Sequence, residues 1–163
     1  MKITFIGGGN MATALIGGMQ KQGFSAAAIQ VVEPFQEARD RITETFGVRA
    51  VAAVDAAALS CDVLVLAVKP QQMKAAVEPL AGKLARQVVL SIAAGLRVAD
   101  MASWLDYGKI VRAMPNTPAL IGAGITGLFA DPCVDHDERC EVEKILHAVG
   151  ACVWVENETQ MDV

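Results

Sequence analysis

The chain has 163 residues, a formal net charge of −4 at pH 7 and 53% hydrophobic residues, few of them aromatic. This length fits one domain with a sizeable core, and the abundance of alanine and glycine is typical of an α/β domain whose strands are covered on both faces. The acidic balance and the lack of a basic run argue against nucleic acid or an anionic membrane as a partner.

Strands and helices are predicted to alternate along the chain. A short apolar run at 3–6 favours a buried strand, and the residues after it have helical spacing up to Gly23. Pro34 is expected in the first turn of the second helix, and Asp55 should cap the third. Strands are predicted at 3–6, 29–32, 49–51, 62–68, 88–92, 110–113, 124–129 and 152–155. Helices are predicted from 10, at 37–46, after Asp55, at 71–84, 98–105 and 135–149, and from 156.

This alternation predicts a twisted, mainly parallel sheet with right-handed crossovers and helices on both faces. The strand at 124–129 should reverse direction, because no helix is predicted just before it. Ligands of such sheets bind at the carboxyl ends of the strands. Small residues and prolines follow four of these ends, at 7–10, 67–70, 92–95 and 114–118. Each segment alone is ordinary turn chemistry, but their shared location favours a binding site.

The first of these segments fits the pattern G-x-G-x-x-A, formed by Gly7, Gly9 and Ala12. Gly7 lets the chain turn sharply off the strand, and Gly9 leaves room for a pyrophosphate near the backbone. Ala12 lets the helix pack closely on the strand. The helix start offers free N–H groups to phosphates. The pattern predicts a dinucleotide site, and the alternative is a plain strand–turn–helix.

Glu33 ends the second strand, where an acid can accept a hydrogen bond from the free 2′-hydroxyl of NAD and repel the 2′-phosphate of NADP. Arg39, a turn or two into the next helix, could instead swing toward a phosphate. An acid at the N-terminus of a helix is also favoured by the helix dipole, which is an equally good reason for Glu33.

Two polar residues at the other strand ends are candidate ligand contacts. Lys69 could hold a phosphate or a substrate carboxylate, reach a backbone carbonyl, or lie in solvent at the sheet edge. Asn116 could bond a nicotinamide or a substrate, or form an Asx-turn. No Ser-His-Asp order, nucleophile elbow or P-loop is found, and no catalytic residue is singled out. Hydride transfer from a nicotinamide needs no protein nucleophile, because the cofactor supplies the hydride.

The cysteines lack Cys-x-x-Cys spacing and are interpreted as reduced thiols of a cytoplasmic protein. They are Cys61, Cys133, Cys140 and Cys152. A zinc site could use His136, Cys140, Glu143 and His147 on one helix face, but a charged helix end collects such residues by chance, so no metal is predicted.

An export signal is not predicted either, because the segment 7–10 interrupts the apolar start with flexible and polar residues. The uncharged stretch at 113–130 contains two prolines, Pro115 and Pro118, and several glycines, so it is not expected to span a membrane.

Four motifs, in order and spacing, resemble the pyrroline-5-carboxylate reductases. They are Phe-Ile-Gly-Gly-Gly-Asn-Met-Ala at 5–12, Ala-Val-Lys-Pro at 67–70, Ser-Ile-Ala-Ala-Gly at 91–95 and Arg-Ala-Met-Pro-Asn-Thr-Pro-Ala at 112–119. The resemblance implies a Rossmann-type fold and the last step of proline biosynthesis, in which NAD(P)H delivers hydride to the C=N carbon of 1-pyrroline-5-carboxylate. In this family NADPH is usually preferred, so NADP is the expected cofactor, and Glu33 is a departure that leaves NAD as the alternative.

The resemblance also implies which residues bind the cofactor. The glycine turn should hold the pyrophosphate, the two middle motifs should line the cofactor, and the last should lie near the nicotinamide. The cofactor-binding residues are then Ile6, Gly7, Gly8, Gly9, Asn10, Met11, Ala12, Glu33, Ala67, Val68, Lys69, Pro70, Ile92, Ala93, Ala94, Met114, Pro115 and Asn116.

Members of this family continue into a helical domain that forms a homodimer and contributes much of the substrate site. Its Ser-Gly-Ser-Gly-Pro-Ala-Tyr and Gly-Gly-Thr motifs are not in this sequence. The resemblance therefore implies a dinucleotide-binding domain at 1–155 and the start of a helix leading to that domain at 156–163. Without the helical domain, the chain is expected to be inactive as a reductase. Two alternatives are another NAD(P)-dependent dehydrogenase of small acids, of the β-hydroxyacid or prephenate type, and a non-catalytic nucleotide-sensing module.

Overall fold

The computed structural model describes residues 1–115 and 124–162. Within these ranges one sheet of eight strands has the order β3-β2-β1-β4-β5-β6-β7-β8. Neighbouring strands are parallel except β6 and β7, which run antiparallel. The strands are β1 Ile3–Ile6, β2 Ile29–Val32, β3 Arg49–Val51, β4 Val63–Leu66, β5 Val88–Ser91, β6 Ile110–Met114, β7 Gly124–Ala130 and β8 Gly150–Trp154. The predicted mainly parallel sheet and the reversal at 124–129 are both confirmed.

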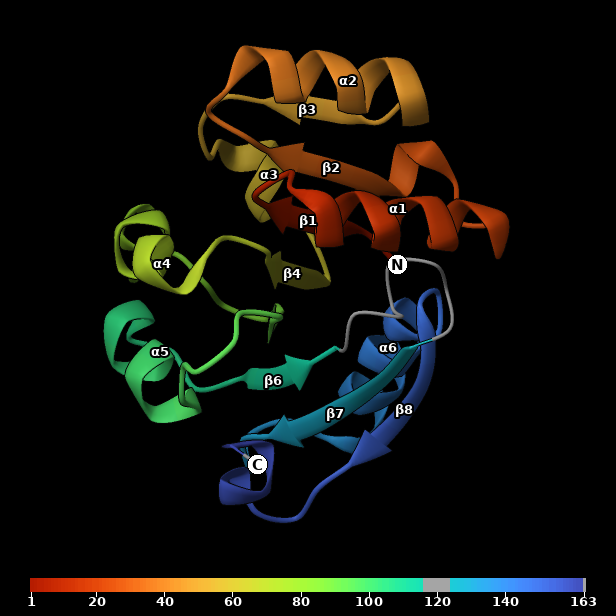
Figure 1. Cartoon of the computed structure of the whole chain (residues 1–163). Coiled ribbons are helices and arrows are strands. Elements are labelled where there is room, and N and C mark those ends of the chain that lie inside the picture. The colour runs from red at the N-terminus through yellow and green to blue at the C-terminus, as the bar shows by residue number, and fades with distance from the viewer. Residues whose placement is uncertain (116–123, 163) are drawn as a thin grey trace.

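Helices cover the two faces of this sheet, as Figure 1 shows for the labelled elements. One buried cluster joins α1, α2 and α6 to the sheet, and a second joins α3, α4 and α5 to the opposite face. The α-helices are α1 Asn10–Lys21, α2 Gln36–Phe46, α3 Ala56–Leu59, α4 Pro70–Val77, α5 Val98–Leu105 and α6 His136–Leu146. Short 3-10 helices are η1 Ala26–Ala28, η2 Glu78–Leu80 and η4 Glu158–Asp162. This is the Rossmann-type, doubly wound fold that the sequence predicts.

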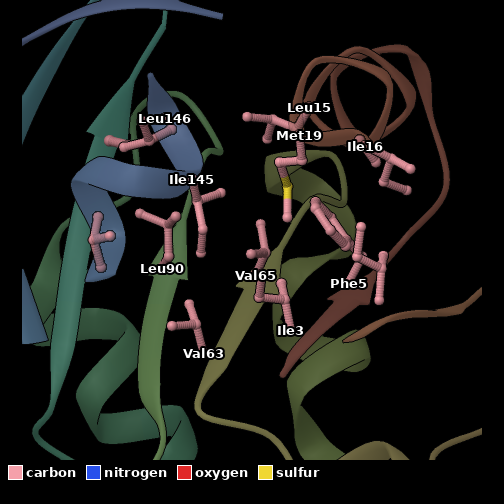
Figure 2. Packing of buried hydrophobic residues seen from close by; sticks show 14 of the residues in the cluster. Ile3, Phe5, Leu15, Ile16, Met19, Val63, Val65, Leu90, Ile145 and Leu146 are labelled. Atoms are coloured by element: carbon pink, nitrogen blue, oxygen red, sulfur yellow. The ribbon is translucent and has the colours of Figure 1, made fainter. Parts of the chain in front are cut away.

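The central strands are apolar throughout because both of their faces are covered. All four residues of β1 and of β4 are buried. Figure 2 shows Leu15 and Met19 from α1 near Phe5, and Ile145 from α6 near Leu90. The burial of these side chains is the main source of stability for the frame that carries the candidate site.

Several element ends differ from the sequence prediction. Pro34 does not lie in a helix, because α2 starts only at Gln36 with Phe35 as its N-cap residue. The helix predicted at 71–84 ends at Val77 and continues as a 3-10 turn that contains Pro79, whose ring nitrogen cannot donate the next helical hydrogen bond. The C-terminal helix is a single 3-10 segment, η4.

The register of the parallel strands brings their carboxyl ends together. Ile6 at the end of β1 pairs with Val32 of β2 on one side and with Leu66 of β4 on the other. Leu66 pairs in turn with Ser91 of β5, and Ser91 pairs with Arg112 of β6. The segments that follow these strands therefore start along one edge of the sheet.

Candidate functional site

The turn after β1 is held tightly between its two neighbouring strands. Gly7 has a φ of +102°, a conformation that residues with a Cβ rarely adopt, and its N–H donates to the Val32 carbonyl at 2.8 Å. A Cβ at Gly7 would lie 2.7 Å from the Ala67 carbonyl oxygen. The Ala67 N–H donates to the Ile6 carbonyl at 2.8 Å. Glycine is therefore required here by both backbone conformation and close packing.

The N-terminus of α1 opens onto free space beyond this turn. Gly9 is the N-cap residue, no side chain of the described residues caps the helix, and a Cβ at Gly9 would have no atom of the described part of the chain within 4 Å, its own chain neighbours aside. Asn10 is exposed and Met11 half-buried, whereas Ala12 is fully buried against the sheet. The first N–H groups of a helix have no partner within it, so this end can bind an anion such as a pyrophosphate.

Glu33 holds the glycine turn and the start of α2 at the same time. Its Oε1 accepts a hydrogen bond from the Gly8 N–H at 3.1 Å, and its Oε2 accepts one from the Phe35 N–H at 3.0 Å. Glu33 is only 8% exposed. Arg39 does not pair with this carboxylate. Its Nη1 instead donates to the backbone carbonyls of Glu33 and Pro34, at 2.8 and 2.7 Å.

A cavity of about 540 Å³ lies beside Glu33, between the ends of β2 and β3 and helix α4. Its walls are mostly apolar, and Glu33 is the only ionisable group among the described residues that line it. The lining residues are Ile6, Gly7, Val32, Glu33, Pro34, Phe35, Ala52, Ala53, Val54, Val68, Gln72, Ala75, Ala76 and Pro79.

The segment after β4 leads directly into α4. Ala67 and Val68 are half-buried, while Lys69 and Pro70 are exposed. Lys69 is the N-cap residue of α4 and Pro70 is its first residue. The Lys69 side chain makes no hydrogen bond or ion pair within the described ranges, so its ammonium group is available to a ligand.

The segments after β5 and β6 complete the edge. The Ile92 N–H donates to the Leu66 carbonyl at 3.2 Å, so the chain is still hydrogen-bonded to the end of β4 one residue after β5 ends. Ala93 is buried and Ala94 exposed. Met114 and Pro115 are half-buried at the end of β6. Asn116, the remaining predicted contact, lies outside the described residues.

A buried ion pair that sequence reasoning missed supports this end of the site. Arg112 in β6 is 1% exposed, and its Nη1 lies 3.2 Å from Oε2 of Glu158 in η4. The same carboxylate oxygen accepts a hydrogen bond from the Val98 N–H, at the start of α5, at 2.8 Å. An arginine within an apolar strand was the available signal, since a buried charge needs a partner. No sequence pattern identified Glu158 as that partner.

The four residues considered for zinc point to different partners. His136 and Cys140 approach to 3.6 Å, but Glu143 accepts a hydrogen bond from the Trp154 indole and His147 lies 3.3 Å from the Gly150 carbonyl. Across residues 1–115 and 124–162, no three His, Cys, Asp or Glu side chains are grouped to hold a metal ion. In the same part of the chain, no helix is long and apolar enough to cross a membrane.

Comparison with known proteins agrees with this geometry. Residues 2–95 match the family described as NADP oxidoreductase, coenzyme F420-dependent. The chain belongs to this family. The match covers β1 to β5, which includes the glycine turn, Glu33 and Lys69.

Several curated relatives that match along nearly the whole chain are pyrroline-5-carboxylate reductases. The chain is 42% identical to that of Pseudomonas aeruginosa over 163 residues, which are 99% of this chain and 60% of the relative. It resembles the structure of the Coxiella burnetii enzyme with a TM-score of 0.94 and 41% identity, covering 99% of this chain and 61% of the other. The Plasmodium falciparum enzyme, described with NADP bound, shares the fold with a TM-score of 0.84 at 23% identity, covering 98% of this chain and 59% of the other.

These findings confirm the resemblance to the N-terminal part of pyrroline-5-carboxylate reductases. The chain spans about 60% of the length of the curated relatives it matches. The family's description also agrees with the prediction of a nicotinamide dinucleotide cofactor.

Proposed function

We propose that this chain is the dinucleotide-binding part of an enzyme that reduces 1-pyrroline-5-carboxylate to L-proline with NAD(P)H. The observation that carries the proposal is the open N-terminus of α1 beyond Gly9, at the edge of the sheet where the six parallel strands β1 to β6 end. The substrate is supported by the similarity to pyrroline-5-carboxylate reductases along 99% of the chain.

The residues predicted for cofactor binding take distinct roles in this proposal. The turn at Gly7 to Gly9 and the first N–H groups of α1 hold the pyrophosphate. Lys69 adds a positive charge from the start of α4, and Met114 and Pro115 border the nicotinamide end. The bound dinucleotide supplies the hydride. The protein orients the ring and excludes water, so no side chain of the described ranges is proposed as a nucleophile.

The substrate domain and the assembly are part of the same proposal. Residues 1–155 form the dinucleotide-binding domain, and 156–163 lead into a helical domain through which the protein forms a homodimer in the cytoplasm. Met161 is 4% exposed and packs close to Gly127 of β7. This contact supports a defined position for the segment that would lead into the helical domain.

An assay of the protein that contains this chain together with the helical domain tests the proposal. Addition of 1-pyrroline-5-carboxylate should oxidise NADPH or NADH, with L-proline as the product. The chain ending at Val163 should bind the dinucleotide without turnover. Turnover of prephenate or a β-hydroxyacid instead would identify a related dehydrogenase. Dinucleotide binding by the folded longer protein, with no turnover of any of these substrates, would identify a sensing module.

A further inference from the structure

The cavity beside Glu33 discriminates between ligands by charge. Glu33 is the only ionisable group among its described lining residues, and none of them is basic. Both carboxylate oxygens are held by backbone N–H groups, from Gly8 and Phe35, so the carboxylate cannot turn away from a ligand in this cavity. Each oxygen keeps a second lone pair, which can accept a hydrogen bond from a hydroxyl group.

A phosphate at the same place would meet an unfavourable environment. It carries up to about two negative charges and would face a fixed carboxylate that is only 8% exposed. Arg39 does not line the cavity, and its Nη1 is already shared by two backbone carbonyls. Arg41 lines a different cavity, between α1 and α2 on the other side of Gly8. The residues present therefore fit a ribose hydroxyl and do not fit a ribose phosphate.

Phe35 provides the second observation. It is 72% exposed, which is unusual for a large apolar side chain, and it lies at the rim of the cavity, whose other walls include Val54, Val68 and Pro79. An aromatic face beside an apolar cavity is suited to stack on a flat heteroaromatic ring such as adenine.

We propose that Glu33 and Phe35 make this cavity a site for the adenosine of an unphosphorylated dinucleotide, so that the protein binds NAD(H) in preference to NADP(H). The inference rests on the proposed dinucleotide-binding function and departs from the family's description as NADP oxidoreductases. Glu33 selects the 2′-hydroxyl, and Phe35 contributes affinity for the ring shared by both cofactors.

Calorimetric titration with two fragments that lack nicotinamide tests this without any turnover. ADP-ribose should bind at least about tenfold more tightly than 2′-phospho-ADP-ribose, given the close repulsion between like charges. In Glu33→Ser and Glu33→Gln this ratio should fall to near one or reverse. Glu37→Gln, which removes an exposed acid of α2 that does not line the cavity, is the matched control and should keep the ratio.

Substitutions of Phe35 should change affinity without changing selectivity. Phe35→Ala should weaken both fragments by roughly tenfold, as loss of a stacking contact does, and Phe35→Trp should restore the affinity. Tighter binding of the 2′-phosphorylated fragment to the wild-type protein, or an unchanged ratio in both Glu33 variants, would overturn the inference and leave dinucleotide binding intact. Loss of that tighter binding in Arg41→Ala would identify the phosphate ligand instead. Failure of both fragments to bind would overturn the proposed function as well.

Discussion

Two glycines of the same turn differ in what they contribute, and substitution separates the two contributions. Gly7 has a φ of +102° and no room for a Cβ, while a Cβ at Gly9 would have no neighbour within 4 Å among the residues that the structure describes. We therefore expect Gly7→Ala to lower the free energy of unfolding by about 1–3 kcal/mol. Gly9→Ala should leave stability nearly unchanged and weaken dinucleotide binding by about tenfold or more. Urea unfolding and calorimetric titration measure the two effects.

The Gly9 result is decisive for the location of the pyrophosphate. If Gly9→Ala binds the dinucleotide as tightly as the wild-type protein, the phosphates do not lie against this part of the backbone. A matched change is Gly23→Ala, because Gly23 also has open space around it but lies at the opposite end of α1. Its φ of +99° predicts some loss of stability and no change in binding.

The thiol of Cys152 is expected to react slowly with alkylating reagents in the folded protein. Its burial, and secondly the charge of Glu143, raise its pKa to about 11. At pH 8 only about one molecule in a thousand would then carry the reactive thiolate. Iodoacetamide at pH 8, followed by peptide mass spectrometry, should label Cys152 far more slowly in the native protein than in urea. Equal rates in the two states would contradict the raised pKa.

At the scale of elements, Glu158 links three segments that are distant in the sequence. It pairs with the buried Arg112 of β6 and accepts a hydrogen bond from the Val98 N–H, so it replaces the missing side-chain cap of α5. Glu158→Ala leaves the arginine charge buried without this partner, and we expect it to lower the free energy of unfolding by about 3 kcal/mol. Glu158→Gln keeps an acceptor and should cost less. Urea unfolding compares the two variants, and equal, small losses would contradict a structural role for the pair.

Asp55 gives the short helix α3 a dependence on pH. Its pKa is lowered, mainly by the hydrogen bond from Arg49 and then by the Ala58 N–H that it caps. Because the folded-state pKa lies below the unfolded value of about 3.9, the carboxylate stabilises the fold above that pH. This contribution is lost as the pH falls through the lowered pKa. Asp55→Asn keeps a capping side chain without the charge, so its stability should fall less between pH 5 and pH 2, roughly the range of carboxylate titration.

The elements themselves were largely predictable, because each carries its own local pattern. The strand predicted at 62–68 contains β4, which is buried along its whole length, and the helix predicted from 135 is α6, which starts with a capping box of Asp135 and Glu138. Two helix boundaries were predicted wrongly, and in both cases a proline was placed on the wrong side of the boundary. Pro34 fits the first turn of a helix, yet α2 starts two residues later. Pro79 was placed inside a helix that it ends.

At the scale of the whole molecule, the strand order decides which segments meet. The sequence predicted the segments at 7–10, 67–70 and 92–95 as one site because parallel strands end at the same edge. It could not predict the contacts that join these segments to the rest of the fold, such as Gly8 with Glu33, or the pairing of Arg112 with Glu158, since these depend on register and on tertiary packing. The glycine turn is therefore visible in the sequence, whereas the carboxylate that orders it became assignable only in the fold.

The two tryptophans test whether the sheet behaves as one cooperative unit. Trp104 lies in α5 on one face, and Trp154 ends β8, with Arg139 stacked 5.2 Å from its ring centroid. Because β7 and β8 continue the same sheet as β1, both fluorophores should report one urea midpoint, equal to that of circular dichroism. Trp104→Phe and Trp154→Phe isolate the two signals, and within each variant fluorescence and circular dichroism should agree.

The same urea titration in the presence of a dinucleotide tests whether ligand binding is coupled to the stability of the whole sheet. At about a hundredfold excess over the dissociation constant it should stabilise the native state by about 2.7 kcal/mol and shift both tryptophan signals together. The ligand is proposed to contact the ends of β1, β2 and β4, far in the strand order from β8, so a shared shift requires energetic coupling across the sheet. A shift seen by Trp104 alone would mean that β7, β8 and α6 unfold as a separate unit, and that the antiparallel step at β6 divides the domain.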